Sequence, residues 1–131
     1  MALSADREYE VQGDTEILEL ESGAADELYK GAVVNIGTDG YIKVAADVSA
    51  EVTIGVMKKR VTATGAHEKV AVERGKIWVP HSGAAVADVG ALFHFDADDV
   101  AVDGAGSNVS GYLCVGWKTG YVLLDLRIKT L

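Results

Sequence analysis

Three histidines and the acidic residues near them have the most potential for chemistry in this chain. His67 precedes Glu68, and His94 precedes Asp96 by two positions. A protein zinc site needs several ligands that converge on one ion, and such sites have recognisable spacings of Cys and His. His67, His81 and His94 show no such spacing. The sequence therefore predicts no metal site, and it favours surface or interface positions for the histidines.

The acidic run Asp96-Ala97-Asp98-Asp99 superficially suggests a calcium loop. A helix-loop-helix calcium loop needs oxygen ligands at alternate positions, followed by glycine. Val100 and Val102 occupy those alternate positions here. The run is therefore interpreted as a solvated turn.

Ser82 is a candidate nucleophile only at first sight. In a nucleophile elbow, glycine stands two residues before the serine, and here that position is Pro80. An enzyme that uses His94 with Asp96 or Asp98 stays open as the last-ranked hypothesis. The sequence predicts that the chain is not an enzyme, and it assigns no catalytic, cofactor-binding or metal-binding residue.

Six other side chains have both a structural and a functional interpretation. The basic cluster Lys58-Lys59-Arg60 has no aromatic platform for nucleic acid. It is expected to blunt an edge strand, or to pair with acidic residues of a neighbouring subunit. Trp78 and Trp117 are expected in the core, with an interface role as the alternative. Cys114 lies in an apolar segment and is expected to be a buried, inert thiol.

Charge and hydropathy narrow the range of partners. The chain has 131 residues and a net charge of −8. Residues 1–51 hold 12 acidic and 3 basic side chains, which disfavours contact with nucleic acid. No apolar run approaches the roughly 20 residues that span a bilayer, and the amino terminus lacks the pattern of a signal peptide. We therefore expect one soluble domain made in the cytoplasm, with neither nucleic acid nor membrane as partner.

Short aliphatic segments bounded by glycines predict an all-β fold. Residues 1–14 are polar and are expected to form a flexible arm ahead of a β domain at 15–131. Ile17–Glu21 alternates as a half-buried strand does. Tight hairpins are predicted at three places, and these are 37–40, Arg74-Gly75 and 118–120.

The carboxy-terminal half adds three expectations. Residues 58–61 are expected to continue the strand that begins at Thr53. Residues 84–88 are the best helical candidate, as at most one short helix. In the last strand, Val122, Leu124, Leu126 and Ile128 share an apolar face, so the opposite face, with Leu123 and Asp125, is expected to be mostly polar.

The order of these segments resembles a known family. The matching segments are Lys30-Gly31-Ala32-Val33-Val34, Gly55-Val56, the Val70–Val79 segment, Val89-Gly90-Ala91-Leu92-Phe93-His94-Phe95-Asp96, and Gly120 to Leu126. Together they cover roughly residues 15–128 and resemble the capsid decoration (cement, head-stabilising) proteins of tailed bacteriophages and prophages. Asp125 departs somewhat from the pattern of the final strand.

The resemblance implies a small β-barrel (β-tulip-like) that forms homotrimers. Such a protein binds the major capsid protein on the outer surface of the virion, at threefold or quasi-threefold positions, and stabilises the shell. The amino-terminal arm is expected to contact the capsid protein. The alternative is a carbohydrate-binding or adhesin-type module whose exposed aromatics, Tyr41, Tyr112, Trp117 or Tyr121, stack on sugar rings.

Overall fold

The computed structural model describes residues 3–23, 27–47, 51–62, 64–95, 101–103 and 111–130. These residues form strands and one 3-10 helix, which confirms the predicted all-β class. The strands are β1 (Glu10–Glu21), β2 (Val33–Ile36), β3 (Ile42–Val44), β4 (Val52–Met57), β5 (Lys69–Pro80), β6 (Leu92–Phe95), β7 (Ala101–Asp103), β8 (Gly111–Lys118) and β9 (Tyr121–Thr130). The 3-10 helix η1 (Val86–Asp88) lies inside the segment predicted to be helical.

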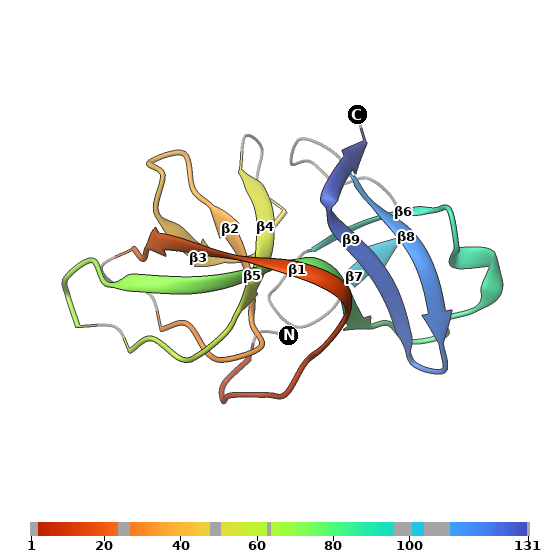
Figure 1. Ribbon diagram of the computed structural model, residues 1–131, viewed down its shortest axis with the longest axis horizontal. Coiled ribbons are helices and arrows are strands. Elements are labelled where there is room, and N and C mark those ends of the chain that lie inside the picture. The colour runs from red at the N-terminus through yellow and green to blue at the C-terminus, as the bar shows by residue number, and fades with distance from the viewer. Residues whose placement is uncertain are drawn as a thin grey trace.

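β5 is the spine of the nine-stranded antiparallel sheet. One edge of β5 pairs with β1, and the other edge pairs first with β4 and then with β9. The strand β2 continues the sheet from β4 to β3, while β8 and β6 continue it from β9 to β7. Two strands share one edge of β5, so the sheet divides into two halves and curls into a half-barrel (Figure 1).

Each half of the sheet covers its own group of buried side chains. The larger group is built on β5, β6, β8 and β9, and its largest members are Phe93, Phe95 and Tyr112. The smaller group is built mainly on β2, β4 and the first part of β5, around Leu28, Ile42 and Met57. A fold of this size needs such clusters, because apolar burial is the main term that offsets the chain entropy lost on folding.

Two of the three predicted hairpins are confirmed. Ile36 pairs with Ile42 across the first turn, where Gly40 has φ +86°. Lys118 pairs with Tyr121 across the third turn, where Gly120 has φ +80°. Glycine suits both turns because it adopts positive φ without a steric penalty.

The hairpin predicted at Arg74-Gly75 is wrong, because both residues lie inside the continuous strand β5. Gly75 allows β1 to approach β5 closely, and it does not form a turn. A Cβ there would lie 2.7 Å from Cγ2 of Thr15, where β1 crosses β5 with a register shift. The sequence pattern therefore indicated correctly that position 75 requires glycine. The requirement comes from the close approach of two strands and not from a turn.

Two further strand predictions need correction. The strand β4 ends at Met57, and residues 58–60 form an exposed bend, so the basic cluster is not an edge strand. The polar face predicted for β9 is buried in part, since Leu123 and Asp125 are each 3% exposed whereas Arg127 is exposed. Trp78 lies directly opposite Leu123 and helps to cover that face, and Arg127 pairs with the Asp125 carboxylate at 3.2 Å.

The amino-terminal segment is folded onto the body of the protein from residue 6 onward. The Arg7 amide donates to the Lys30 carbonyl at 2.9 Å, and the Lys30 amide donates to the Asp6 carboxylate at 3.0 Å. The strand β1 begins at Glu10, so it crosses the boundary expected between arm and domain at residues 14 and 15. Hydrogen bonds and ion pairs hold this segment, and such contacts produce no apolar periodicity in the sequence. The polar composition therefore predicted a loose arm.

Candidate functional site

A buried carboxylate fixes the amino-terminal segment against β5. Glu73 is 8% exposed, and its two oxygens accept hydrogen bonds from the hydroxyls of Tyr9 and Thr15, each at 2.5 Å. Tyr9 immediately precedes β1, and Thr15 lies in the irregular stretch of β1, between Gln12 and Glu16, where the register with β5 shifts. This arrangement, the Glu73 clamp, therefore holds the segment at two points.

The clamp shifts the pKa of both acidic partners. Burial raises the pKa of the Glu73 carboxyl, but the hydrogen bonds from Thr15 and Tyr9 and the nearby Lys58 ammonium outweigh it, so the pKa is lowered overall. Burial, the hydrogen bond to Glu73 and the negative charges of Glu73 and Glu8 all raise the pKa of the Tyr9 phenol. At neutral pH the clamp therefore consists of a carboxylate and a neutral phenol.

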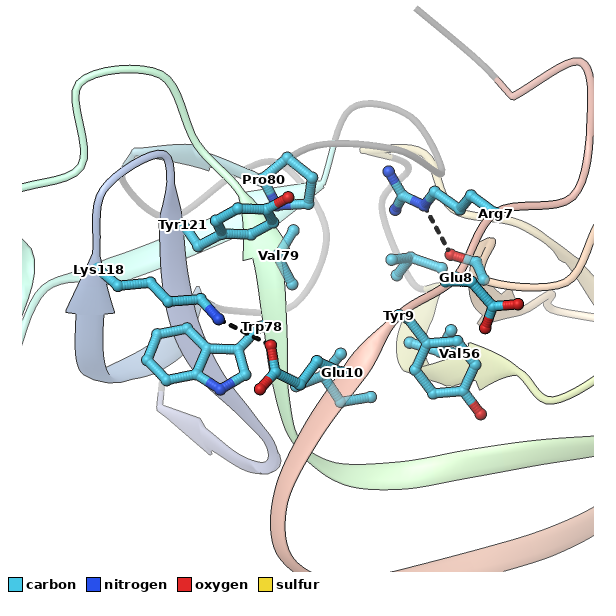
Figure 2. Close-up of a pocket in the computed structure, with 13 residues that line it drawn as sticks. Arg7, Glu8, Tyr9, Glu10, Val56, Trp78, Val79, Pro80, Lys118 and Tyr121 are labelled. Carbon is cyan, nitrogen blue, oxygen red and sulfur yellow. Dashed lines mark hydrogen bonds and ion pairs between the residues drawn. The ribbon is translucent and has the colours of Figure 1, made fainter.

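A cleft of about 420 Å³ lies between this segment and the β8–β9 hairpin. One wall is the segment from Arg7 to Glu10, and the opposite wall carries Trp78, Pro80, Lys118 and Tyr121 (Figure 2). Buried aliphatic side chains of β2, β4 and β5 line it between these walls, and these are Val33, Val56, Ile77 and Val79. The cleft thus combines an apolar lining with aromatic and charged groups.

Lys118 joins the two walls of the cleft. Its Nζ lies 2.7 Å from Oε1 of Glu10, and also 4.6 Å and 5.2 Å from the ring centroids of Trp78 and Tyr121. Both distances are within the range of a cation–π interaction. The side chains of Lys118 and Glu10 stay 43% and 63% exposed, so this ion pair lies at the mouth of the cleft.

The other charged groups of the cleft also have polar partners. Both carboxylate oxygens of Glu8 lie 2.9 Å from Nζ of Lys30, and Nε of Arg7 donates to the Gly31 carbonyl at 3.1 Å. Gly31 has φ +83°, and a Cβ at this position would collide with the Arg7 backbone. Glycine is therefore required where the segment crosses over the start of the β2 region.

A second surface feature is a set of exposed apolar side chains on η1 and β8. Val86, Val89, Val115 and Trp117, here called the η1–β8 patch, are 68%, 44%, 36% and 41% exposed. The Gly90 amide donates to the Cys114 carbonyl at 2.8 Å, which places the end of the η1 segment beside β8. Exposed apolar side chains gathered on neighbouring segments are typical of protein contact sites.

The expectation that both tryptophans pack in the core is met only in part. Trp78 is half-buried in the cleft wall, whereas Trp117 is exposed on β8. Of the four tyrosine and tryptophan side chains considered for sugar stacking, Tyr112 is 1% exposed and unavailable. Tyr41 is stacked on His67 with ring centroids 3.7 Å apart.

The histidines do not converge on a common point. His67 Nδ1 lies 2.7 Å from the Ser22 carbonyl oxygen, and His81 meets the Phe93 ring edge-on at 4.9 Å. His94 is 9% exposed in β6. Among the described residues, no group of three or more His, Cys, Asp or Glu side chains could hold a metal ion. The candidates Asp96, Asp98 and Asp99 lie outside the described residues.

Arg60 and Cys114 both have partners within the fold. Arg60 of the basic cluster pairs with Glu27 at 2.8 Å and lies over the Tyr29 ring at 4.8 Å. Cys114 is buried as predicted, and its Sγ donates to the Gly116 carbonyl at 3.2 Å. Ser82 lies exposed in a turn after β5.

The part of the chain that the structure describes includes no helix with the length and apolarity needed to cross a membrane.

Sequence patterns missed both the cleft and a buried polar network. In the network, Asn35 Nδ2 donates to Glu51 at 3.1 Å, Thr53 donates to Asn35 at 2.7 Å, and Lys43 pairs with Glu51 at 3.0 Å. The Tyr112 hydroxyl closes the network by donating to the Thr53 carbonyl at 2.7 Å. Isolated polar residues in short strands were the only signal in the sequence.

No protein-family model, curated protein or solved structure matches this chain.

Proposed function

We propose that this chain is a structural virion protein that binds the outer surface of a tailed-phage capsid. It acts as homotrimers at threefold or quasi-threefold positions, contacts the major capsid protein and stabilises the shell. The observation that carries the proposal is the η1–β8 patch. Four exposed apolar side chains on neighbouring segments, on a protein with net charge −8, provide a surface for docking onto another protein.

The fold supports this proposal through the placement of the family-like segments. Gly55-Val56 lies in β4, Val70–Val79 in β5, Leu92–Phe95 in β6, and Tyr121–Leu126 in β9. These segments build the two halves of one curled sheet, as expected of a rigid subunit that presents surfaces on its periphery. The resemblance of sequence order is thus compatible with the observed architecture.

The proposed mechanism is burial of apolar surface at joints between capsid subunits. Burial of apolar area contributes about 25 cal/mol per Å² before the entropic cost of association is subtracted. A trimer makes three contacts at once, so modest individual contacts add up to strong retention. The acidic half of the chain contributes long-range attraction wherever the capsid surface is basic.

Co-sedimentation with undecorated, expanded capsids tests the proposal. The wild-type protein is expected to pellet with the capsids and to raise their thermal or chemical stability. Val86→Asp places a charge in the η1–β8 patch and is expected to weaken binding at least about tenfold, a change of about 1.4 kcal/mol. Ile17→Asp is the matched control, because Ile17 is 46% exposed on β1, outside the patch. Absence of co-sedimentation by the wild-type protein overturns the proposal.

Light scattering on the isolated protein addresses the trimer separately. A mass of three subunits is expected if the subunit joint forms without the capsid. A monomer at all concentrations removes the preformed trimer from the proposal and leaves assembly on the capsid surface.

A further inference from the structure

The cleft between the amino-terminal segment and the β8–β9 hairpin has the size of a small-ligand site. Its volume of about 420 Å³ falls within the roughly 300–1,000 Å³ typical of ligand pockets. Such pockets combine an apolar lining with a few placed polar groups. Here the lining comes from buried aliphatic residues, and the polar groups stand at the mouth (Figure 2).

The two ion pairs of the cleft favour a neutral ligand. Lys118 is compensated by Glu10, and Glu8 is compensated by Lys30. Nε of Arg7 is engaged by the Gly31 carbonyl. An anion such as a phosphate would compete with Glu10 for Lys118 and with Glu8 for Lys30, and a cation would compete with Lys118 and Lys30 for the two carboxylates. A ligand that exchanges hydrogen bonds without carrying charge avoids both costs.

The wall opposite the segment favours a ligand with an apolar face. Trp78 and Tyr121 project from neighbouring strands on the same side of the sheet, because Trp78 lies opposite Leu123 and Tyr121 lies opposite Pro80. Tyr121 is 40% exposed, Trp78 is half-buried, and both line the cleft. Lys118 Nζ lies over both rings, so a ligand packs on the ring surface beside this ammonium. Aromatic rings present a large apolar face at little conformational cost.

We infer that the cleft binds a neutral saccharide of one or two pyranose rings. The C–H face of a ring packs against the wall of Trp78 and Tyr121. Neighbouring hydroxyl groups donate to the Glu10 carboxylate and accept from the Lys118 ammonium, which lie 2.7 Å apart and so match the separation of two adjacent polar groups. Of the four aromatics considered for sugar stacking from the sequence, this site uses Tyr121 and adds Trp78, Glu10 and Lys118 to it. It is independent of capsid docking through the η1–β8 patch.

An NMR titration of the labelled protein tests the inference. The probes are the methyl glycosides of glucose, galactose, mannose and N-acetylglucosamine, together with cellobiose, lactose and chitobiose. They are added to about 20 mM, because millimolar affinity corresponds to only about −4 kcal/mol. At least one probe is expected to give saturable shifts of the Trp78 indole N–H and of the amides of Glu10, Lys118 and Tyr121.

Variants locate the binding in the cleft. Trp78→Ala is expected to weaken binding at least about tenfold, while Trp78→Phe retains an aromatic face and stays within about threefold of wild type. Trp117→Ala is the matched control and should leave the affinity unchanged. Trp117 lies opposite Val122, so it projects from the other face of the sheet than Trp78. Unchanged circular dichroism shows that each variant is folded.

Three outcomes overturn the inference. One is the absence of saturable shifts with every probe in the folded wild-type protein. Another is binding that Trp117→Ala abolishes and Trp78→Ala preserves. The third is that inorganic phosphate or adenosine, titrated in the same way as further probes, binds in the cleft while the sugars do not. Capsid co-sedimentation is scored in a separate assay, so failure of either proposal leaves the other standing.

Discussion

Removal of one hydroxyl from the Glu73 clamp is expected to cost a large part of the stability of the fold. Tyr9→Phe deletes the donor at 2.5 Å from a carboxylate that is 8% exposed, and the carboxylate keeps the hydrogen bond from Thr15 and the nearby charge of Lys58. Hydrogen bonds to charged groups contribute about 1.5–3 kcal/mol. With a urea m-value of about 1–3 kcal/mol/M, the unfolding midpoint falls by about 1 M at pH 7.

The pH dependence of this effect follows from the lowered pKa of Glu73. Its ordinary value is 4.5, and the folded value lies below that. A carboxyl with a depressed folded pKa stabilises the fold above its unfolded pKa, and this contribution is lost as the pH falls through the folded pKa. The advantage of wild type over Tyr9→Phe is therefore expected to narrow as the pH drops below about 4.5.

Urea unfolding between pH 7 and pH 3, followed by tryptophan fluorescence, measures both effects. Tyr41→Phe is the matched control, because Tyr41 packs on His67 through its ring, and phenylalanine keeps that stacking. The control should stay within about 0.5 kcal/mol of wild type. If Tyr9→Phe also stays within that range, or if its deficit does not change with pH, the clamp does not hold the segment in the way that the distances indicate.

The remaining predictions concern packing, titration and the buried network. Gly55→Ala places a Cβ 2.7 Å from Cγ1 of Val72 and is expected to lower the free energy of unfolding by more than about 2 kcal/mol. The added Cβ of Gly116→Ala meets no atom nearer than 3.4 Å, so its free energy of unfolding should stay within about 1 kcal/mol of wild type in the same urea assay. Equal losses at both sites would contradict the strand spacing. The Tyr9 phenol has a raised pKa, so its contribution to stability is present below about pH 10 and is lost as the pH rises through the folded pKa. Burial also raises the pKa of the Tyr112 phenol, so absorbance at 295 nm should show two tyrosines that titrate late. The loss of one of them in Tyr9→Phe identifies Tyr9. Asn35→Ala leaves buried partners unsatisfied and should cost about 2 kcal/mol or more in thermal unfolding, whereas a neutral effect would show that the network contributes little.

Local sequence patterns predicted correctly those turns whose conformation depends only on the residues of the turn itself. Glycine with positive φ at Gly40 and Gly120 marked two hairpins correctly, since the turn alone requires it. Gly75 marked a site where β1 passes close to β5, and no local pattern separates that requirement from a turn. Leu123 and Asp125 are buried because of Trp78 and Arg127, and the contact with Trp78 joins residues far apart in the sequence.

The cleft could not be predicted from the sequence for a related reason. The Glu10–Lys118 ion pair joins residues 108 positions apart, and the Glu73 clamp joins residues 58 and 64 positions apart. A polar amino-terminal segment without apolar periodicity is indistinguishable from a loose arm until its partners are known. The exposure of Trp117 also depends on the register shift in β8, where Val115 is the extra residue between Cys114 and Gly116.

A cryo-EM map of expanded, initially undecorated tailed-phage capsids incubated with this protein is the most direct test of the proposed role. The expected result is density for three copies at each threefold or quasi-threefold position, with the η1–β8 patch against the major capsid protein or a neighbouring copy. Bare capsids at saturating protein concentration would contradict the capsid-binding role. Bound copies with the patch facing solvent would contradict the docking surface assigned to it.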